Sequence, residues 1–131
     1  MPTKRWEMTA HCAGRSLIVA GGIGLMAIML TTVEVMNTET RQWYTAAALS
    51  DPTSNFSATV CGDQIYMLGG DDKNWKVTAS VYSCSLSALL KSCSSPSDKS
   101  SVWSRVSDCP AKSSTCVSLR GRMLAIGGQD Y

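Results

Sequence analysis

Three short apolar runs recur along the chain, each preceded by a glycine and closed by a Gly-Gly pair. The runs lie at 17–20, 65–68 and 123–126. A short apolar run bounded by glycines is typical of a buried strand. Self-similarity at a period of about 50 residues indicates a repeat architecture. The glycines of the pattern are Gly14, Gly21, Gly22, Gly62, Gly69, Gly70, Gly121, Gly127 and Gly128.

Further strand candidates lie on both sides of these blocks. Residues 32–37 alternate after the first block, and a polar turn leads from them to a strand that opens at Trp43. The second block is followed by a strand candidate at 79–82 and by its own tryptophan, Trp103. Residues 56–61 and 114–119 predict a strand before the second and third blocks. The pattern therefore predicts an all-β chain with four short strands in each repeat.

These motifs resemble the kelch repeat, in which a Gly-Gly pair is followed by an aromatic residue and, seven positions later, by a tryptophan. Tyr82 matches the aromatic position in the second repeat, and Met36 stands in its place in the first, with Trp43 seven positions on. The second tryptophan, Trp103, comes later than this spacing because the second repeat has an insertion. The resemblance covers residues 12–128 and implies four-stranded antiparallel blades of a β-propeller.

The resemblance makes residues 1–131 a single kelch-repeat region, with repeats at about 11–55 and 56–112 and a partial repeat at 113–131. The second repeat has an enlarged, Ser-rich loop at 84–101, in which 86–90 predicts a short helical turn. Trp6 does not fit the register. About two to three blades fall short of the 4–8 that propellers contain. We therefore expect an incomplete propeller, either part of a larger protein or a chain that self-associates to complete one.

The formal net charge is +2, and no basic run is interleaved with aromatic residues. We therefore expect no nucleic-acid partner. The six cysteines are irregularly spaced without a Cys-x-x-Cys pair, which favours reduced thiols in a cytoplasmic protein. The alternative is a secreted protein, in which Cys84 and Cys93, flanking the insertion, are the first candidates for a disulfide.

An uninterrupted stretch of uncharged residues at 16–33 competes with the repeat interpretation. Alone, it predicts a short membrane anchor, because Lys4, Arg5 and Arg15 precede it. We favour a strand, an apolar loop and a strand, since the repeat predicts both flanking strands independently, and we expect no membrane partner. A membrane-anchored or secreted, disulfide-stapled β module using 16–33 is the alternative function.

The sequence offers little catalytic chemistry. His11 is the only histidine, and we expect it on the surface or in a turn. Some oxidases share the kelch propeller and bind copper through several imidazole and phenol ligands, which this chain does not supply. A galactose-oxidase-like copper enzyme fragment is therefore the least favoured alternative. We expect no enzyme, no catalytic residue, no metal ion and no cofactor.

The resemblance implies that loops on one face of the propeller bind a protein partner. Here these are the loop after Gly22 and the loop after Gly70, whose candidate contact residues are Asp72, Asn74, Trp75 and Lys76. An exposed tryptophan among polar residues suits a binding hot spot, although burial of Trp75 against a neighbouring blade is the other interpretation. The sequence thus predicts a protein–protein interaction module, serving substrate recognition or scaffolding in a larger protein.

Overall fold

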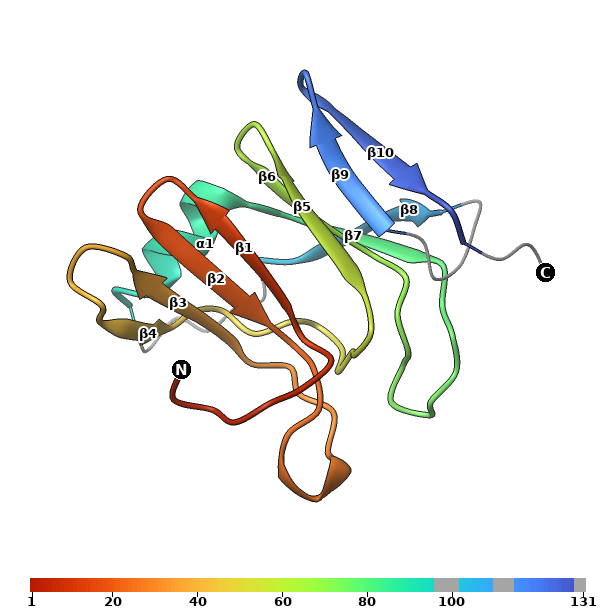
Figure 1. Cartoon of the computed structure of the whole chain (residues 1–131), viewed down its shortest axis with the longest axis horizontal. Coiled ribbons are helices and arrows are strands. Elements are labelled where there is room, and N and C mark those ends of the chain that lie inside the picture. The colour runs from red at the N-terminus through yellow and green to blue at the C-terminus, as the bar shows by residue number, and fades with distance from the viewer. Residues whose placement is uncertain (96–101, 110–114, 129–131) are drawn as a thin grey trace.

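The chain forms antiparallel β-sheets stacked side by side, as a computed structural model shows (Figure 1). The structure describes residues 1–95, 102–109 and 115–128. Two sheets have four strands each, and a third has two among the described residues. The predicted all-β class and the four-stranded antiparallel sheets are confirmed.

The first sheet consists of β1 (Thr9–Ala13), β2 (Ser16–Ala20), β3 (Val33–Asn37) and β4 (Trp43–Thr45), hydrogen-bonded in chain order. The uncharged stretch at 16–33 is thus a strand and a loop that leads into another strand, and the loop contains the one-turn 3-10 helix Leu25–Ala27. Asn37 closes the sharp turn into β4, because its Oδ1 accepts from the backbone N–H of Glu39 and Thr40. Trp43 opens a strand, as predicted.

The second sheet repeats this order with β5 (Ser57–Cys61), β6 (Gln64–Leu68), β7 (Ser80–Ser85) and β8 (Ser104–Asp108). The helix α1 (Leu86–Ser92) follows β7 directly and confirms the predicted helical turn. It begins where the Ser85 hydroxyl accepts from the N–H of Ala88, an N-cap that satisfies a free helical donor. Residues 96–101 of the predicted Ser-rich loop lie outside the described residues.

The third sheet is the hairpin of β9 (Thr115–Leu119) and β10 (Arg122–Ile126). Figure 1 shows the three sheets side by side, with β5 lying between the first strands of the other two, β1 and β9, both of which it contacts. The turns β1–β2, β5–β6 and β9–β10 all point to one edge of the molecule, the upper edge of the view.

A continuous apolar core fills the space between the first two sheets. Val33 on β3 and Leu89 on α1 are fully buried in it, together with Trp103. The helix also holds the connection between the sheets: the Ala47 N–H donates to Ser92 Oγ at 2.8 Å, and Trp103 Nε1 donates to the Ala47 carbonyl at 3.4 Å. The helical part of the insertion, Leu86–Ser92, is therefore packed into the core, in contrast to the surface loop expected from the sequence.

A close backbone approach follows the apolar strand of each four-stranded sheet. A Cβ on Gly70 would lie 2.5 Å from the Ser54 carbonyl oxygen and 2.7 Å from Phe56 Cβ, and its φ is +89°. Gly22, the equivalent glycine of the first repeat, would bring a Cβ to 2.6 Å from the Trp6 carbonyl oxygen, at a φ of +87°. Only glycine fits both the space and this left-handed backbone. The Gly-Gly pairs of the first two repeats therefore have a packing reason.

The strand register differs from the sequence alignment at one repeat position. Met36 lies opposite Leu17, whereas Tyr82 lies opposite Met67. The offset that carries Gly22 to Gly70 carries Leu17 to Ile65, not to Met67. The two residues matched by sequence are thus two positions apart in the sheets.

Glu34 occupies the place in the first sheet that Tyr82 has in the second. Glu34 pairs with Thr45 and Tyr82 pairs with Arg105, two residues after Trp43 and Trp103 respectively. The two tryptophans therefore hold matching positions. Trp43 follows Glu34 by nine positions, so a fixed spacing of seven counted back from Trp43 falls on Met36 instead.

We predict that Gly70→Ala destabilises the fold by about 2–5 kcal/mol, from the left-handed backbone and the overlap with Ser54. Gly62→Ala is the matched control, because Gly62 also has a positive φ, +62°, but nothing lies within 4 Å of its added Cβ. It should cost only about 1–2 kcal/mol. Urea unfolding of both variants measures the difference, and equal losses would contradict the close-approach explanation.

Candidate binding loops

The β6–β7 loop carries the candidate contact residues and is ordered by Asp72. One carboxylate oxygen of Asp72 accepts from the backbone N–H of Asn74 at 2.8 Å and of Lys76 at 3.0 Å. The Asp72 N–H in turn donates to the Lys76 carbonyl at 3.0 Å. The N–H of Lys76 and then that of Asn74 lower the pKa of Asp72. At neutral pH the charged carboxylate therefore holds the loop in a defined turn.

Trp75 lies at the tip of this turn with 56 % of its surface exposed. Its N–H donates to the Asp72 carbonyl at 2.8 Å, and its φ is +61°, a conformation that side-chain-bearing residues seldom adopt. Ala27, at the equivalent position of the first repeat, has a φ of +58°. Trp75 thus has a structural equivalent that the sequence did not indicate. Of the two interpretations of Trp75, the structure shows the exposed one.

The β2–β3 loop is the corresponding loop of the first sheet. Ile23 pairs with Met29 across it, as Asp71 pairs with Val77 across the β6–β7 loop. Its tip is apolar, since Leu25, Met26 and Ile28 are all exposed, Met26 by 92 %. Three exposed apolar side chains in one short turn form a patch of the kind that marks an interaction site.

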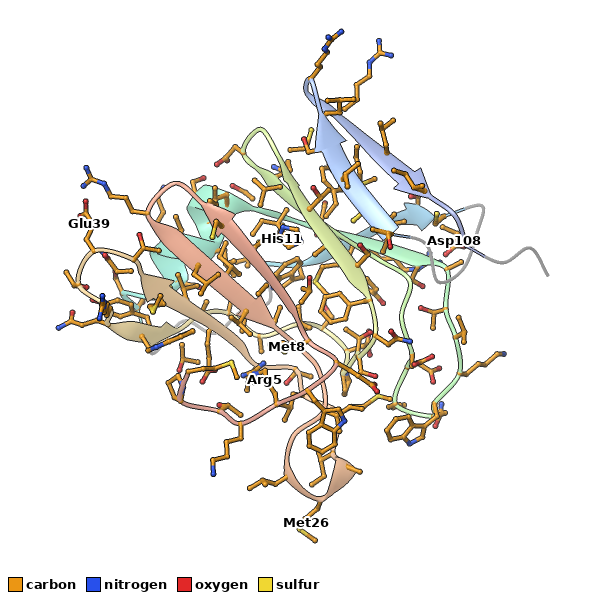
Figure 2. All side chains as sticks on the ribbon, viewed as in Figure 1. Arg5, Met8, His11, Met26, Glu39 and Asp108 are labelled. Atoms are coloured by element: carbon orange, nitrogen blue, oxygen red, sulfur yellow. The ribbon has the colours of Figure 1, made fainter. Side chains whose placement is uncertain are left out.

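Both loops project from the same edge of the molecule, opposite the hairpin turns (Figure 1). In Figure 2, Met26 marks the tip of the β2–β3 loop at the lower limit of the molecule. The exposed Trp6 pairs through its backbone with Ile23, at the base of this loop. We call the two loops, residues 23–30 and 71–77, together with Trp6, the loop edge.

A buried ion pair secures the base of the β2–β3 loop. The Arg5 guanidinium lies 3.0 Å from Glu34 Oε2, and their side chains are 0 % and 5 % exposed. Arg5 also donates to the carbonyl oxygens of Gly21 and Thr32, one at each end of the loop, at 2.8 and 3.0 Å. The sequence suggested Arg5 only as a positive flank of a membrane anchor. No helix in the described ranges is long and apolar enough to span a membrane.

A small pocket lies behind the loop edge, between the segment 49–53 and the second sheet. Met67, Tyr82 and Trp103 form its wall, and its volume is about 60 Å³. The Tyr82 hydroxyl donates to Asp51 Oδ2 at 3.4 Å. Burial is the main cause that raises the pKa of Tyr82, and the negative charge of Asp51 is the second. Small-molecule sites usually measure about 300–1,000 Å³. The pocket is therefore too small for an ordinary metabolite.

His11 lies on β1, half-buried against the second sheet, not in a turn or on the open surface as expected. It shares a hollow of about 10 Å³ with Ala58, Met67 and Trp103. Burial lowers the pKa of His11, partly opposed by a hydrogen bond to the backbone of Ala58. Within the described part of the chain, no three His, Cys, Asp or Glu side chains are grouped so as to hold a metal ion.

Cys84 and Cys93, the pair considered for a disulfide, both have free thiols. Burial raises the pKa of Cys84 to about 11, so this thiol stays protonated at neutral pH. A protonated, buried thiol is a weak nucleophile and acts as a small apolar side chain. Neither cysteine therefore contributes reactive chemistry to the loop edge.

We predict that Arg5→Met destabilises the fold by about 3–5 kcal/mol, because Glu34 is left buried without its cation. The double variant Arg5→Met with Glu34→Met should recover part of the loss, since no buried charge then remains while the Gly21 and Thr32 carbonyls still lack the Arg5 donor. Arg15→Met is the control, because its pair with Glu39 is exposed, and a change within about 0.5 kcal/mol is expected. Urea unfolding measures all three; a double variant as unstable as Arg5→Met would contradict the explanation.

We predict that His11 makes the fold less stable in acid. Its folded pKa lies below the ordinary value of 6.5, so this stabilisation is complete above pH 6.5 and is lost as pH falls through the folded pKa. His11→Gln should remove this part of the pH dependence. Thermal unfolding of both proteins between about pH 8 and pH 5 measures it. Parallel pH profiles would show that other groups carry the dependence.

No known protein family matches the chain when it is compared with family profiles, and no curated protein is found to be similar to it.

Proposed function

We propose that the chain is a kelch-type β-propeller segment and a protein–protein interaction module whose loop edge contacts the partner. The observation that carries this proposal is the pair of equivalent loops, one in each four-stranded sheet, that project from one edge with exposed apolar tips. A protein partner fits these tips, because aromatic residues and methionine are enriched where protein surfaces meet.

The packing of the sheets supports the propeller part of the proposal. In each four-stranded sheet the strands follow one another in chain order, and the first strands β1, β5 and β9 lie together. Gathered first strands and apolar faces buried between neighbouring sheets are what an arrangement of blades around a propeller axis requires. The matching places of Trp43 and Trp103 and the Gly-Gly contacts agree with the kelch resemblance.

The side chains at the loop edge favour recognition of a protein over binding of a small molecule. Trp75 is a rigid, exposed aromatic on an ordered turn, so little conformational entropy is lost when it inserts into a partner. Met26 and Leu25 are adaptable apolar neighbours, and Lys73 and Lys76 supply charge beside Trp75. An apolar centre with a polar rim is the usual anatomy of a protein interface.

We propose a cytoplasmic location and no enzymatic activity. The free thiols of Cys84 and Cys93 suit a reducing compartment. The membrane-anchored or disulfide-stapled alternative gains no support from the described residues, since 16–33 form β2 and a loop that leads into β3. The copper-enzyme alternative gains none either, because His11 faces an apolar hollow.

The proposal predicts that a variant with Leu25→Ser, Met26→Ser and Trp75→Ser loses its partner while keeping its fold. The wild-type chain and the variant are used as baits, and the captured proteins are quantified by mass spectrometry. Each candidate is then purified and its affinity measured. We expect binding at least tenfold weaker than wild type, as for the loss of a hot spot.

Tyr44→Ser is the matched control, because Tyr44 is an exposed aromatic on β4, away from the loop edge. It should bind like the wild type. Stability should change by no more than about 0.5 kcal/mol per exposed substitution. If the triple variant binds every captured protein with unchanged affinity, the loop edge is not the binding surface.

A further inference from the structure

The β9–β10 hairpin has one packed face and one open face. Cys116 and Met123 pack against Leu68 and Val81 of the second sheet. Side chains alternate between the faces of a strand, so the neighbours of Cys116 and Met123 point away from that sheet. The opposite face carries four exposed apolar side chains, with Thr115 and Arg122 at its two ends. The four residues are Val117, Leu119, Leu124 and Ile126; we call them the trailing face.

The trailing face has counterparts in both other sheets, and those counterparts are packed. The offset from Gly128 back to Gly70 carries Leu124 and Ile126 to Tyr66 and Leu68, which pack against the third sheet. The offset from Gly70 back to Gly22 carries Tyr66 and Leu68 in turn to Ile18 and Ala20. Both of these residues are buried against the second sheet. Each earlier sheet thus uses this face to bind the sheet that follows.

The first sheet presents the complementary surface on its side away from the second sheet. Cys12, Leu17, Met36 and Trp43 lie opposite one another in the strand register and therefore share this face, with Ala10 beside them. We call these five residues the leading face. None of the five is charged, and Ala10 and Cys12 are exposed. Glu34 continues the face toward the loop edge, where its charge is already balanced by Arg5.

The leading face is equivalent to a surface that already binds a trailing face. The offset from Gly22 to Gly70 carries Leu17 to Ile65 and Met36 to Cys84, both buried in the core between the first two sheets. Ala10 corresponds in the same way to Ala58, which is buried there too. Among the described residues, both halves of an interface that the chain builds twice internally are therefore left open.

We propose that a second copy of the chain docks its leading face on the trailing face of the first, head to tail. The reciprocal contact closes a dimer with two equivalent interfaces. Among the described residues, two copies contribute four four-stranded sheets and two hairpins; counted as blade positions these fall within the 4–8 blades typical of propellers, whereas three copies exceed that number. The dimer rests on the blade packing proposed above but not on the partner of the loop edge.

Light scattering after size exclusion, in reducing buffer and at several concentrations, tests this proposal. The wild type is expected at twice the chain mass of 14.0 kDa. Leu124→Asp on the trailing face and Ala10→Asp on the leading face should each give a monomer, since each buries a charge in both interfaces. Val106→Asp is the control, because Val106 is exposed on β8, outside both faces, and its variant should remain dimeric.

Circular dichroism and cooperative unfolding show whether each variant is folded. If Leu124→Asp is unfolded, Ile126→Asp is used as the trailing-face variant in its place. A wild type at 14.0 kDa or a polydisperse aggregate overturns the proposal. A dimer that persists in Ala10→Asp also overturns it, because two trailing faces would then pair with each other. Binding through the loop edge is measured separately with the Leu124→Asp monomer, so either proposal can fail alone.

Discussion

The arrangement of the sheets depends on one recurrent backbone contact, between the second glycine of a Gly-Gly pair and the segment that precedes the sheet's first strand. At this point the N–H of Ile23 donates to the Trp6 carbonyl at 2.8 Å, and the N–H of Asp71 donates to the Ser54 carbonyl at 2.9 Å. A side chain at Gly22 or Gly70 would separate these backbones. The contact fixes where the first strand of each sheet begins, and the loop that belongs to the loop edge starts directly after it. The position of the core strands and the position of the candidate binding loops therefore depend on the same glycine contact.

The same segment is attached to the third strand of its sheet by different chemistry in the two repeats. Thr3 donates to Glu34 Oε1 at 2.7 Å in the first repeat, and Tyr82 donates to Asp51 at 3.4 Å in the second. Thr3 and Asp51 are separated by the same offset as Gly22 and Gly70. In the first repeat the buried charge of Glu34 also requires Arg5, which in turn satisfies the carbonyl groups at both ends of the apolar loop. The neutral hydroxyl of Tyr82, which takes the place of Glu34 in the second repeat, needs no cation equivalent to Arg5.

These differences explain what the sequence predicted and what it did not. The strands and the helix after β7 follow from short-range patterns, and these were predicted correctly. The Arg5–Glu34 pair joins residues 29 positions apart, and no local pattern indicates it. The half-burial of His11 depends on the second sheet packing against β1. The sequence left the exposure of Trp75 open, because it depends on the turn that Asp72 builds. Met36 was misplaced because the fixed spacing was counted back from Trp43, whereas the offset between Gly22 and Gly70 leads from Tyr82 to Glu34. Arg5 and His11 were misjudged because their contacts are tertiary, and periodicity alone does not specify such contacts.

The two exposed apolar surfaces lie in different directions, and this has a consequence for binding. The trailing face is on the flank of the molecule, whereas the loop edge lies at the ends of the strands (Figure 1). In a head-to-tail dimer the copies are related by rotation about an axis along the first strands, which keeps both loop edges on the same side of the assembly. A partner with two contact points would then bind the dimer more tightly than the monomer, without any new contact, because the second contact forms within one complex. In the two proposals, self-association and partner recognition use different residues, and dimer formation would strengthen the binding of a partner with two contact points.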